Sequence, residues 1–176
     1  MRKLKLQMTI LLDDKWDSGM TNFSIDNLKN VDSILLGRNT AEGFIPYWGE
    51  VAKNPKDSLY KLGKPLNDIP KVVFSKKLKT SKWDNASIVK GDITKEIKAL
   101  KRKKGKDIIV YGGDSFVSSL IQHGLIDEYY LLVNPFAIGN GQSAFNPLKN
   151  RIKVTLVKCQ PFACGAVLLQ YEPTSN

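Results

Sequence analysis

Short apolar runs alternate with segments of helical periodicity along nearly the whole chain. Runs rich in β-branched, leucine and aromatic residues predict strands, at residues 2–12, 31–36, 71–74, 87–89, 108–111, 127–135, 152–160 and 163–171. Apolar residues at three- and four-residue spacing predict helices between most of them, at residues 24–30, 38–44, 56–62, 93–104 and 116–124.

Capping and breaking residues refine these boundaries. Ser24 is a candidate N-cap for the first helix, and Asp92 or Thr94 for the helix that begins near residue 93. We expect residues 46–49 to form a loop with two large aromatics. We expect the helix at residues 56–62 to stop at Gly63 and Pro65, and Pro161–Phe162 to be the turn between the last two strands.

This element order predicts one α/β domain over residues 1–176. Strands that alternate with helices form a mostly parallel central sheet covered on both faces, which gives three layers. The last two strands are consecutive, so they add an antiparallel C-terminal hairpin.

Composition narrows the class of protein. The chain is 42% hydrophobic and 25% charged, and none of its apolar runs has the length of a membrane span. The N-terminus lacks a signal-peptide pattern, so we expect a cytoplasmic protein. Cys159 and Cys164 make no disulfide framework, and His123 is the only histidine, so we expect no metal site.

The net charge of +10 is concentrated in one region. Residues 71–106 hold 13 Lys/Arg and 3 Asp/Glu, and residues 101–106 are almost all basic. A nucleic-acid patch is one interpretation, but aromatic residues are not interleaved and no nucleic-acid motif is present. We favour a solvated, lysine-rich helix end and expect no nucleic-acid partner.

The clearest candidate for a ligand-binding segment is residues 108–121. An apolar strand runs into Gly112–Gly113 and then a helix, for which Asp114 or Ser115 is a candidate N-cap. Such a turn exposes the N–H groups of a helix N-terminus and can hold a phosphate. An ordinary strand–helix connection is the alternative.

Two further strand ends share this chemistry. One reads Gly37-Arg38-Asn39-Thr40 and the other Ser75-Lys76-Lys77. Ligands of open parallel sheets bind at the carboxyl ends of the strands, and Arg and Lys suit phosphates. The three ends together indicate a ligand with phosphates in two separate places. The Gly-x-Gly-x-x-Gly and Gly-Lys-Ser/Thr motifs are both absent.

In this order, residues 34–44, 72–76 and 109–113 resemble the dihydrofolate reductase superfamily. The longer pattern from Gly112 to Phe145 resembles its branch with the reductase domain of bacterial riboflavin biosynthesis. The resemblance implies a sheet of about eight strands flanked by helices, and NADPH as cofactor. Members are often homodimers, and the apolar C-terminal strands are candidates for such an interface.

The resemblance also implies cofactor contacts at the three strand ends. The phosphates would be held at a helix start, the 2′-phosphate by a basic loop, and the pyrophosphate by the glycine turn. The residues are, in that order, Gly37, Arg38 and Thr40; Ser75, Lys76 and Lys77; and Gly112, Gly113, Asp114 and Ser115. We expect the Asp114 carboxylate to cap its helix and point away from the pyrophosphate.

The end of the first strand differs from the sequence pattern usual in this branch. Its usual end is Ser-Leu-Asp-Gly, whereas residues 11–14 read Leu-Leu-Asp-Asp and the following loop is short. Asp13 is the candidate catalytic carboxylate, which positions the substrate or assists protonation; the alternative is a loop aspartate. Tyr47 and Trp48 are candidates for stacking on the substrate, with loop packing as the alternative.

The resemblance thus implies an NADPH-dependent reductase that transfers hydride to a pterin-like, pyrimidine-like or other small conjugated ring. One alternative is the 5-amino-6-(5-phosphoribosylamino)uracil reductase of riboflavin biosynthesis. Another is a catalytically weak nucleotide-binding module of the same fold, which the altered first-strand motif favours.

Overall fold

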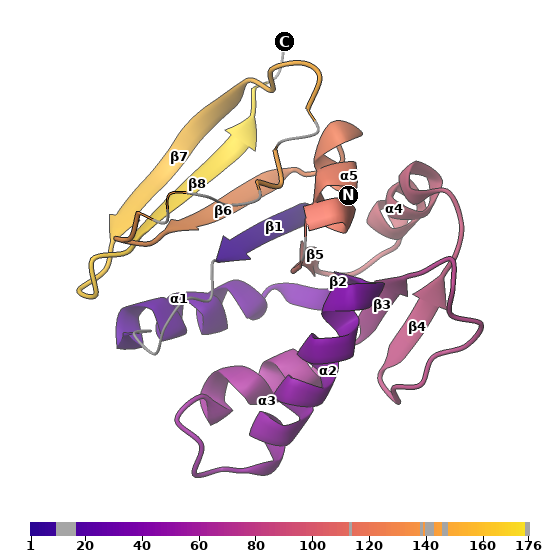
Figure 1. The fold of residues 1–176 in the computed structure, drawn as a ribbon, viewed down its shortest axis with the longest axis horizontal. Helices are drawn as coiled ribbons and strands as arrows, with labels where there is room; N and C mark the ends of the chain where they lie inside the picture. Colours follow the sequence, from indigo (N-terminus) through magenta and orange to yellow (C-terminus); the bar gives the residue numbers. More distant parts are fainter. Residues whose placement is uncertain (10–16, 113, 138, 140–142, 146–147, 175–176) are drawn as a thin grey trace.

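The computed structural model describes residues 1–9, 17–112, 114–137, 139, 143–145 and 148–174 (Figure 1). The strands are β1 Leu4–Thr9, β2 Val31–Gly37, β3 Lys71–Phe74, β4 Ala86–Val89, β5 Asp107–Val110, β6 Glu128–Val133, β7 Val154–Pro161 and β8 Val167–Pro173. The helices are α1 Ser18–Leu28, α2 Arg38–Lys53, α3 Tyr60–Asp68, α4 Ile93–Arg102 and α5 Asp114–Gln122.

The strands form one eight-stranded sheet in the order β4-β3-β2-β5-β1-β6-β8-β7. Neighbours from β4 to β6 are parallel, and β8 is antiparallel to both β6 and β7. This confirms the predicted mostly parallel sheet with an antiparallel C-terminal hairpin.

Helices cover both faces of the sheet. On one face the core joins the β1 and β5 side chains to Ile97 of α4 and to Val117 and Leu120 of α5. On the other face Leu28 of α1, Ala41 of α2 and Leu62 of α3 share a core with β2 and β3. The three predicted layers are therefore present.

The first helix begins earlier than its sequence predicts. Asp17 is the N-cap of α1, and its Oδ1 accepts a 2.8 Å hydrogen bond from the Met20 N–H. Ser24 lies inside the helix, buried, and its Oγ accepts from Gln7 Nε2 at 3.2 Å. The N-cap assigned to Ser24 was wrong because Ser24 instead satisfies a buried polar residue of β1.

Helix α2 is much longer than expected. It continues through Pro46, so the predicted loop at residues 46–49 was wrong. Helix α3 likewise runs through Gly63 and Pro65, which had been expected to end a helix. A Cβ on Gly63 would lie 2.4 Å from Cγ1 of Val51, so this glycine allows α2 and α3 to approach closely. Packing between the two helices overrides the local breaking signals.

Two smaller differences concern the C-terminal hairpin and the end of α4. The hairpin turn lies at residues 162–166 rather than at 161–162, and the Phe162 N–H donates to the Ala166 carbonyl at 2.8 Å. Lys101 does not belong to a solvated face, because it is buried and pairs with Asp127 at 2.5 Å. Asp92, one of the two predicted candidates, is the N-cap of α4.

In the described part of the chain, every helix is too short or too polar to cross a bilayer.

Candidate functional site

The three polar strand ends lie next to one another. β2 is paired with β3 on one side and with β5 on the other, and the register sets Gly37 beside Phe74 and Leu35 beside Val110. Arg38, Ser75 and Gly112 therefore follow neighbouring strands at the same carboxyl edge of the sheet. We call this edge, with residues 37–40, 75–77 and 111–112, the anionic-ligand rim.

The rim includes the N-terminus of α2. Gly37 is the N-cap and makes no side-chain capping hydrogen bond, and the first helical turn holds no acidic residue. The uncompensated helix dipole and the Arg38 guanidinium thus act at one place. Both favour an anion.

Gly112 lies against this helix start. Its φ of +140° is in the range that favours glycine, and a Cβ there would lie 2.8 Å from Thr40 Oγ1. A Cβ on Gly37 would similarly lie 2.9 Å from Cβ of Phe116 in α5. Close approach of the three segments therefore depends on both glycines, and the first turns of α2 and α5 come together.

Ser75 organises the third segment. Its side chain is buried, and its Oγ accepts hydrogen bonds from the N–H groups of Lys77 at 3.2 Å and Leu78 at 3.1 Å. The hydroxyl thus closes a tight turn after β3. Lys76 and Lys77 stand in this turn with exposed side chains, so their positive charges lie at the rim.

Glu42 lies beside the rim, although the sequence alone did not single it out. It lies one turn after Arg38 on α2, with its Oε1 3.9 Å from Arg38 Nη1. Glu42 also pairs with Lys82 from the loop between β3 and β4. The i,i+4 spacing of Arg38 and Glu42 was a sequence signal for their pairing, but Lys82 is distant in sequence.

The model of one protein family matches most of this chain. The RibD C-terminal domain aligns with residues 13–168. The chain belongs to the RibD C-terminal domain family. This confirms the resemblance to the riboflavin-biosynthesis reductase branch of the dihydrofolate reductase superfamily.

Relatives and solved structures agree with the RibD C-terminal domain assignment. Uncharacterized protein YyaP of Bacillus subtilis (strain 168) is 34% identical over 159 residues, which span 89% of this chain and 79% of YyaP. A putative riboflavin biosynthesis protein from Shewanella sp. PV-4 has a TM-score of 0.70 at 16% identity, over 99% of this chain and 100% of that one.

Dihydrofolate reductase from Enterococcus faecalis, complexed with NADP(H) and RAB-propyl, has a TM-score of 0.64 at 15% identity, over 98% of this chain and 97% of that one. At this identity the likeness shows a shared fold. The dihydrofolate reductase-like architecture expected from the sequence is thereby confirmed.

Some predicted site residues of this RibD C-terminal domain lie where the structure does not test them. Asp13 and Gly113 are outside the described residues. Asp114 and Ser115 open helix α5 beside the rim, and the Ser115 side chain is exposed. The roles of these four residues stay predictions.

Tyr47 and Trp48 lie on α2, away from the rim's first helical turn. The Trp48 ring contacts Phe44 at 6.1 Å between centroids and packs close to Gly63 of α3. Tyr47 is 53% exposed and meets the Trp48 ring edge-on at 4.9 Å. Packing between helices accounts for Trp48, and stacking on a substrate stays a prediction for both residues.

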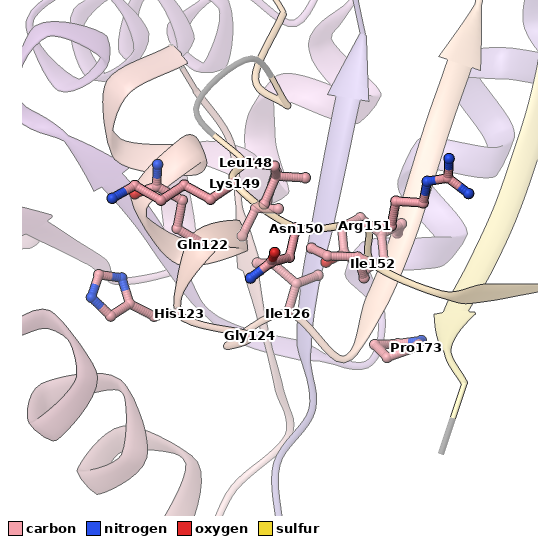
Figure 2. A pocket seen from close by; sticks show the side chains of 12 residues that line it. Gln122, His123, Gly124, Ile126, Leu148, Lys149, Asn150, Arg151, Ile152 and Pro173 are labelled. Atoms are coloured by element: carbon pink, nitrogen blue, oxygen red, sulfur yellow. The ribbon is translucent and has the colours of Figure 1, made fainter. Parts of the chain in front are cut away.

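A hollow lies at the end of α5 that is remote from the rim (Figure 2). It has a volume of about 450 Å³, and Gln122, His123, Lys149 and Arg151 contribute polar side chains to it. Since α5 begins at the rim and ends at this hollow, the two are separate. The hollow is therefore no part of the predicted cofactor site.

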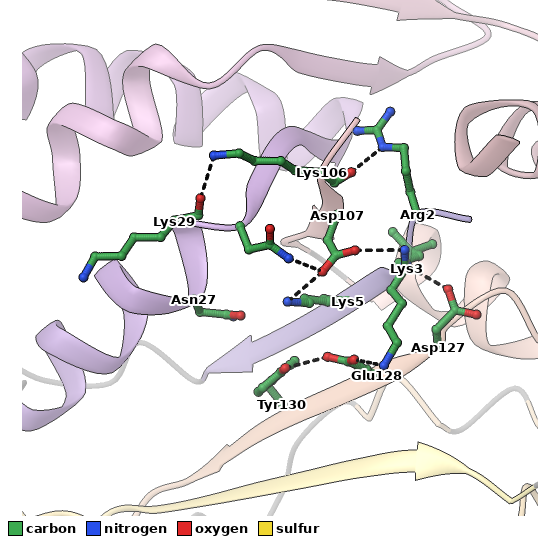
Figure 3. Close-up of polar contacts among 12 residues, drawn as sticks. Arg2, Lys3, Lys5, Asn27, Lys29, Lys106, Asp107, Asp127, Glu128 and Tyr130 are labelled. Carbon is green, nitrogen blue, oxygen red and sulfur yellow. Dashed lines mark hydrogen bonds and ion pairs between the residues drawn. The ribbon is translucent and has the colours of Figure 1, made fainter. Parts of the chain in front are cut away.

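A network of charged side chains, with Lys5 and Glu128 buried and Lys3 exposed, lies at the amino ends of the central strands (Figure 3). Glu128 accepts from Lys3 Nζ at 2.5 Å and from the Tyr130 hydroxyl at 2.6 Å, while Lys5 pairs with Asp107 at 3.0 Å. Burial and the neighbouring Glu128 carboxylate raise the pKa of Tyr130. The network holds β1 between β5 and β6, at the edge opposite the rim, because buried charges require such partners.

Among the described residues, no group of three His, Cys, Asp or Glu side chains is arranged to hold a metal ion.

Proposed function

We propose that this protein is an NADPH-dependent reductase that transfers hydride to a pterin-like, pyrimidine-like or other small conjugated ring. The observation that carries the proposal is the meeting of three sequence-distant segments at the rim. Three groups of residues follow the carboxyl ends of neighbouring strands: Arg38 with Thr40, Ser75 with Lys76 and Lys77, and Gly112. An open parallel sheet binds nucleotides at this kind of place.

The rim fits the phosphates of a dinucleotide. The N-terminus of α2 has no side-chain cap and no acidic residue in its first turn, so it can accept a phosphate together with the Arg38 guanidinium. At Gly112 a Cβ would collide with Thr40, so glycine lets the turn after β5 lie against the start of α2, where its backbone is proposed to meet a pyrophosphate. In this proposal Gly113, Asp114 and Ser115 complete the pyrophosphate site at the start of α5.

The basic turn after β3 favours NADPH over NADH. Lys76 and Lys77 are exposed on a turn that Ser75 closes, and β3 is next to β2 in the sheet. Their charges suit the 2′-phosphate that distinguishes the two cofactors. Bound NADPH supplies the hydride, and the protein supplies orientation and electrostatics.

Asp13 is the proposed catalytic carboxylate. In the sequence it comes four residues after the end of β1, and β1 lies between β5 and β6 with its carboxyl end at the same edge of the sheet as the rim. In that position Asp13 would hold the substrate ring or assist its protonation. Tyr47 and Trp48 are proposed substrate contacts.

The second candidate activity is the 5-amino-6-(5-phosphoribosylamino)uracil reductase of riboflavin biosynthesis. Membership of the RibD C-terminal domain family and the likeness to a putative riboflavin biosynthesis protein favour it. A nucleotide-binding module without turnover is the alternative from another functional class.

An absorbance assay at 340 nm separates these functions. It follows NADPH oxidation over a panel of dihydropterins, pyrimidines and ribosylaminopyrimidine phosphates. Turnover of a pterin or free pyrimidine supports the main proposal, and turnover of the phosphorylated pyrimidine alone supports the pathway enzyme. Calorimetric NADPH binding with no turnover on the panel supports a binding module. Absence of both binding and turnover overturns the proposal.

A further inference from the structure

The hollow at the end of α5 is lined by a buried tyrosine whose hydroxyl makes no hydrogen bond within the described part of the chain. Tyr129 of β6 is only 3% exposed, and its ring lies 6.5 Å from that of Phe145 between centroids. Buried polar groups are paired with protein, ordered water or a ligand in the large majority of cases. A partner from outside the chain is therefore expected at this hydroxyl.

The Tyr129 hydroxyl keeps its proton at neutral pH. Burial and the neighbouring Asp127 carboxylate raise the pKa of Tyr129 to about 12. Asp127 already has a cationic partner, since its Oδ2 lies 2.5 Å from Lys101 Nζ. The phenol is therefore a donor in search of an acceptor, and an anionic oxygen is the acceptor that forms the strongest hydrogen bond.

The charged side chains of the hollow are all basic. Lys149 and Arg151 line it, and neither makes an ion pair with any described residue. Figure 2 shows these two side chains on opposite sides of Asn150. His123 holds its Nδ1 2.7 Å from the Ser119 carbonyl oxygen, which leaves its other ring nitrogen for a different partner. Because no Asp or Glu is among the described lining residues, the local potential is positive and favours an anion.

The remaining wall of the hollow is apolar. Its aliphatic residues are Ile121, Ile126, Leu148 and Ile152, from α5, the start of β6 and the segment before β7. The volume of about 450 Å³ is within the ~300–1,000 Å³ of typical small-molecule sites, which combine an apolar wall with a few polar groups. An inorganic anion would leave this wall in contact with water. The lining therefore selects an anion that carries an apolar ring or chain.

We propose that the hollow is a second ligand site, which binds a small organic carboxylate or phosphate monoester. The anionic group accepts a hydrogen bond from the Tyr129 hydroxyl, and Lys149 and Arg151 attract it from two sides. The apolar part of the ligand packs on the aliphatic wall. This site does not depend on the identity of the ligand at the rim, because the two places lie at opposite ends of α5.

Fluorine NMR with three one-ring probes tests the proposal. 4-Fluorobenzoate and 4-fluorophenyl phosphate carry the two kinds of anionic group, and 4-fluorobenzyl alcohol is their uncharged counterpart. At least one of the anions is expected to bind with a Kd of about 1 mM or tighter, and the tighter of the two identifies the group that the site prefers. Absence of binding by both anions, or equal binding of the alcohol, would mean that the hollow holds water only and overturns the proposal.

Two substitutions locate the bound probe. Lys149→Ala/Arg151→Ala is expected to weaken binding of the anion at least about tenfold, because both attracting charges are lost. Lys153→Ala is the matched control, since Lys153 is an exposed cation outside the lining, and it should bind as the wild type does. Arg38→Ala/Lys76→Ala should also leave probe binding unchanged. Binding that survives the first double substitution, or that is lost with the second, places the probe elsewhere and overturns the proposal.

Tyr129→Phe tests the role of the hydroxyl without changing the charge. The variant is expected to bind the anion about five- to tenfold more weakly, because one hydrogen bond to a charged group is lost. Its Tm should not fall, since the hydroxyl has no partner among the described residues whose loss would destabilise the fold. A lower Tm together with unchanged probe affinity would assign the hydroxyl a structural role and contradict the proposed contact.

Discussion

Gly112 and Thr40 approach each other so closely that a Cβ on Gly112 would lie 2.8 Å from the Thr40 Oγ1. The two residues are 72 positions apart in the sequence, yet this contact joins the turn after β5 to the first turn of α2. The predicted phosphate contacts of the chain depend on this junction.

Gly112→Ala is expected to weaken NADPH binding at least tenfold and to lower the free energy of unfolding by about 1–3 kcal/mol. The φ of +140° strains alanine, and the added methyl displaces Thr40. Calorimetry with NADPH and thermal unfolding measure the two effects. Gly124→Ala is the control: its φ is +60°, but among the described residues beyond its chain neighbours no atom lies within 4 Å of its Cβ, so only stability should fall.

Arg38→Ala and Lys76→Ala are each expected to weaken NADPH binding roughly 10- to 100-fold, because a hydrogen bond to a charged group contributes about 1.5–3 kcal/mol. Lys76→Ala should in addition narrow the preference for NADPH over NADH, whereas Arg38→Ala should weaken both. Lys149→Ala removes an equal charge at the separate hollow and should leave binding unchanged. Unaltered NADPH affinity in both rim variants, measured by calorimetry, would show the phosphate assignment to be wrong.

Asp13→Asn is expected to lower the turnover number about 100-fold or more while the dissociation constant of NADPH stays the same. A group that protonates or orients the ring acts on the reaction and not on the cofactor phosphates. Asp14→Asn, the neighbouring carboxylate, is the matched control and should retain activity. Both variants are measured in steady-state assays with the best substrate of the panel. Equal losses of turnover in the two variants would show that Asp13 is a loop aspartate without a catalytic role.

Lys71→Met is expected to raise the free energy of unfolding by about 2 kcal/mol at pH 7, because relief of the buried charge contributes about 3 kcal/mol and loss of the hydrogen bond from Lys71 Nζ to the Asn67 carbonyl costs about 1 kcal/mol. Burial lowers the pKa of Lys71 from 10.5 to about 8, so below pH 8 the folded state carries a buried charge that the unfolded state solvates. Between pH 8 and 10.5 the folded protein releases this proton first, and the stability of the wild type should rise toward that of the variant.

Denaturant unfolding at pH 7, 9 and 10.5 measures this convergence. Lys61→Met on the exposed surface of α3 is the control and should change stability little at any pH. A constant difference between Lys71→Met and the wild type across the three pH values would contradict a lowered pKa.

Local sequence patterns predicted most strands and one of the helix caps. β3 occupies the predicted residues, since Val72, Val73 and Phe74 form a short apolar, β-branched and aromatic run that is typical of a strand. Asp92 caps α4 through a hydrogen bond within its own turn, 2.9 Å from the Lys95 N–H. Signals of this kind depend only on interactions among a few neighbouring residues.

The helix boundaries that sequence missed depend on contacts between distant residues. Gly63 and Pro65 read as stops, yet α3 continues because its Leu62 and Leu66 are buried against α2 and the sheet. Ser24 read as a cap, yet it meets Gln7 across a helix–sheet interface. Propensity is a weak local preference, and the burial of a helix face outweighs it.

The amino-acid sequence by itself determined the alternation of strands and helices, the glycine and basic residues at three strand ends, and the family. The tertiary structure alone decided that those ends are adjacent and that Glu42 lies between Arg38 and Lys82. The physical reason is the range of the interactions: caps, turns and hydrophobic periodicity act over a few residues, whereas strand order and burial join segments far apart in the chain.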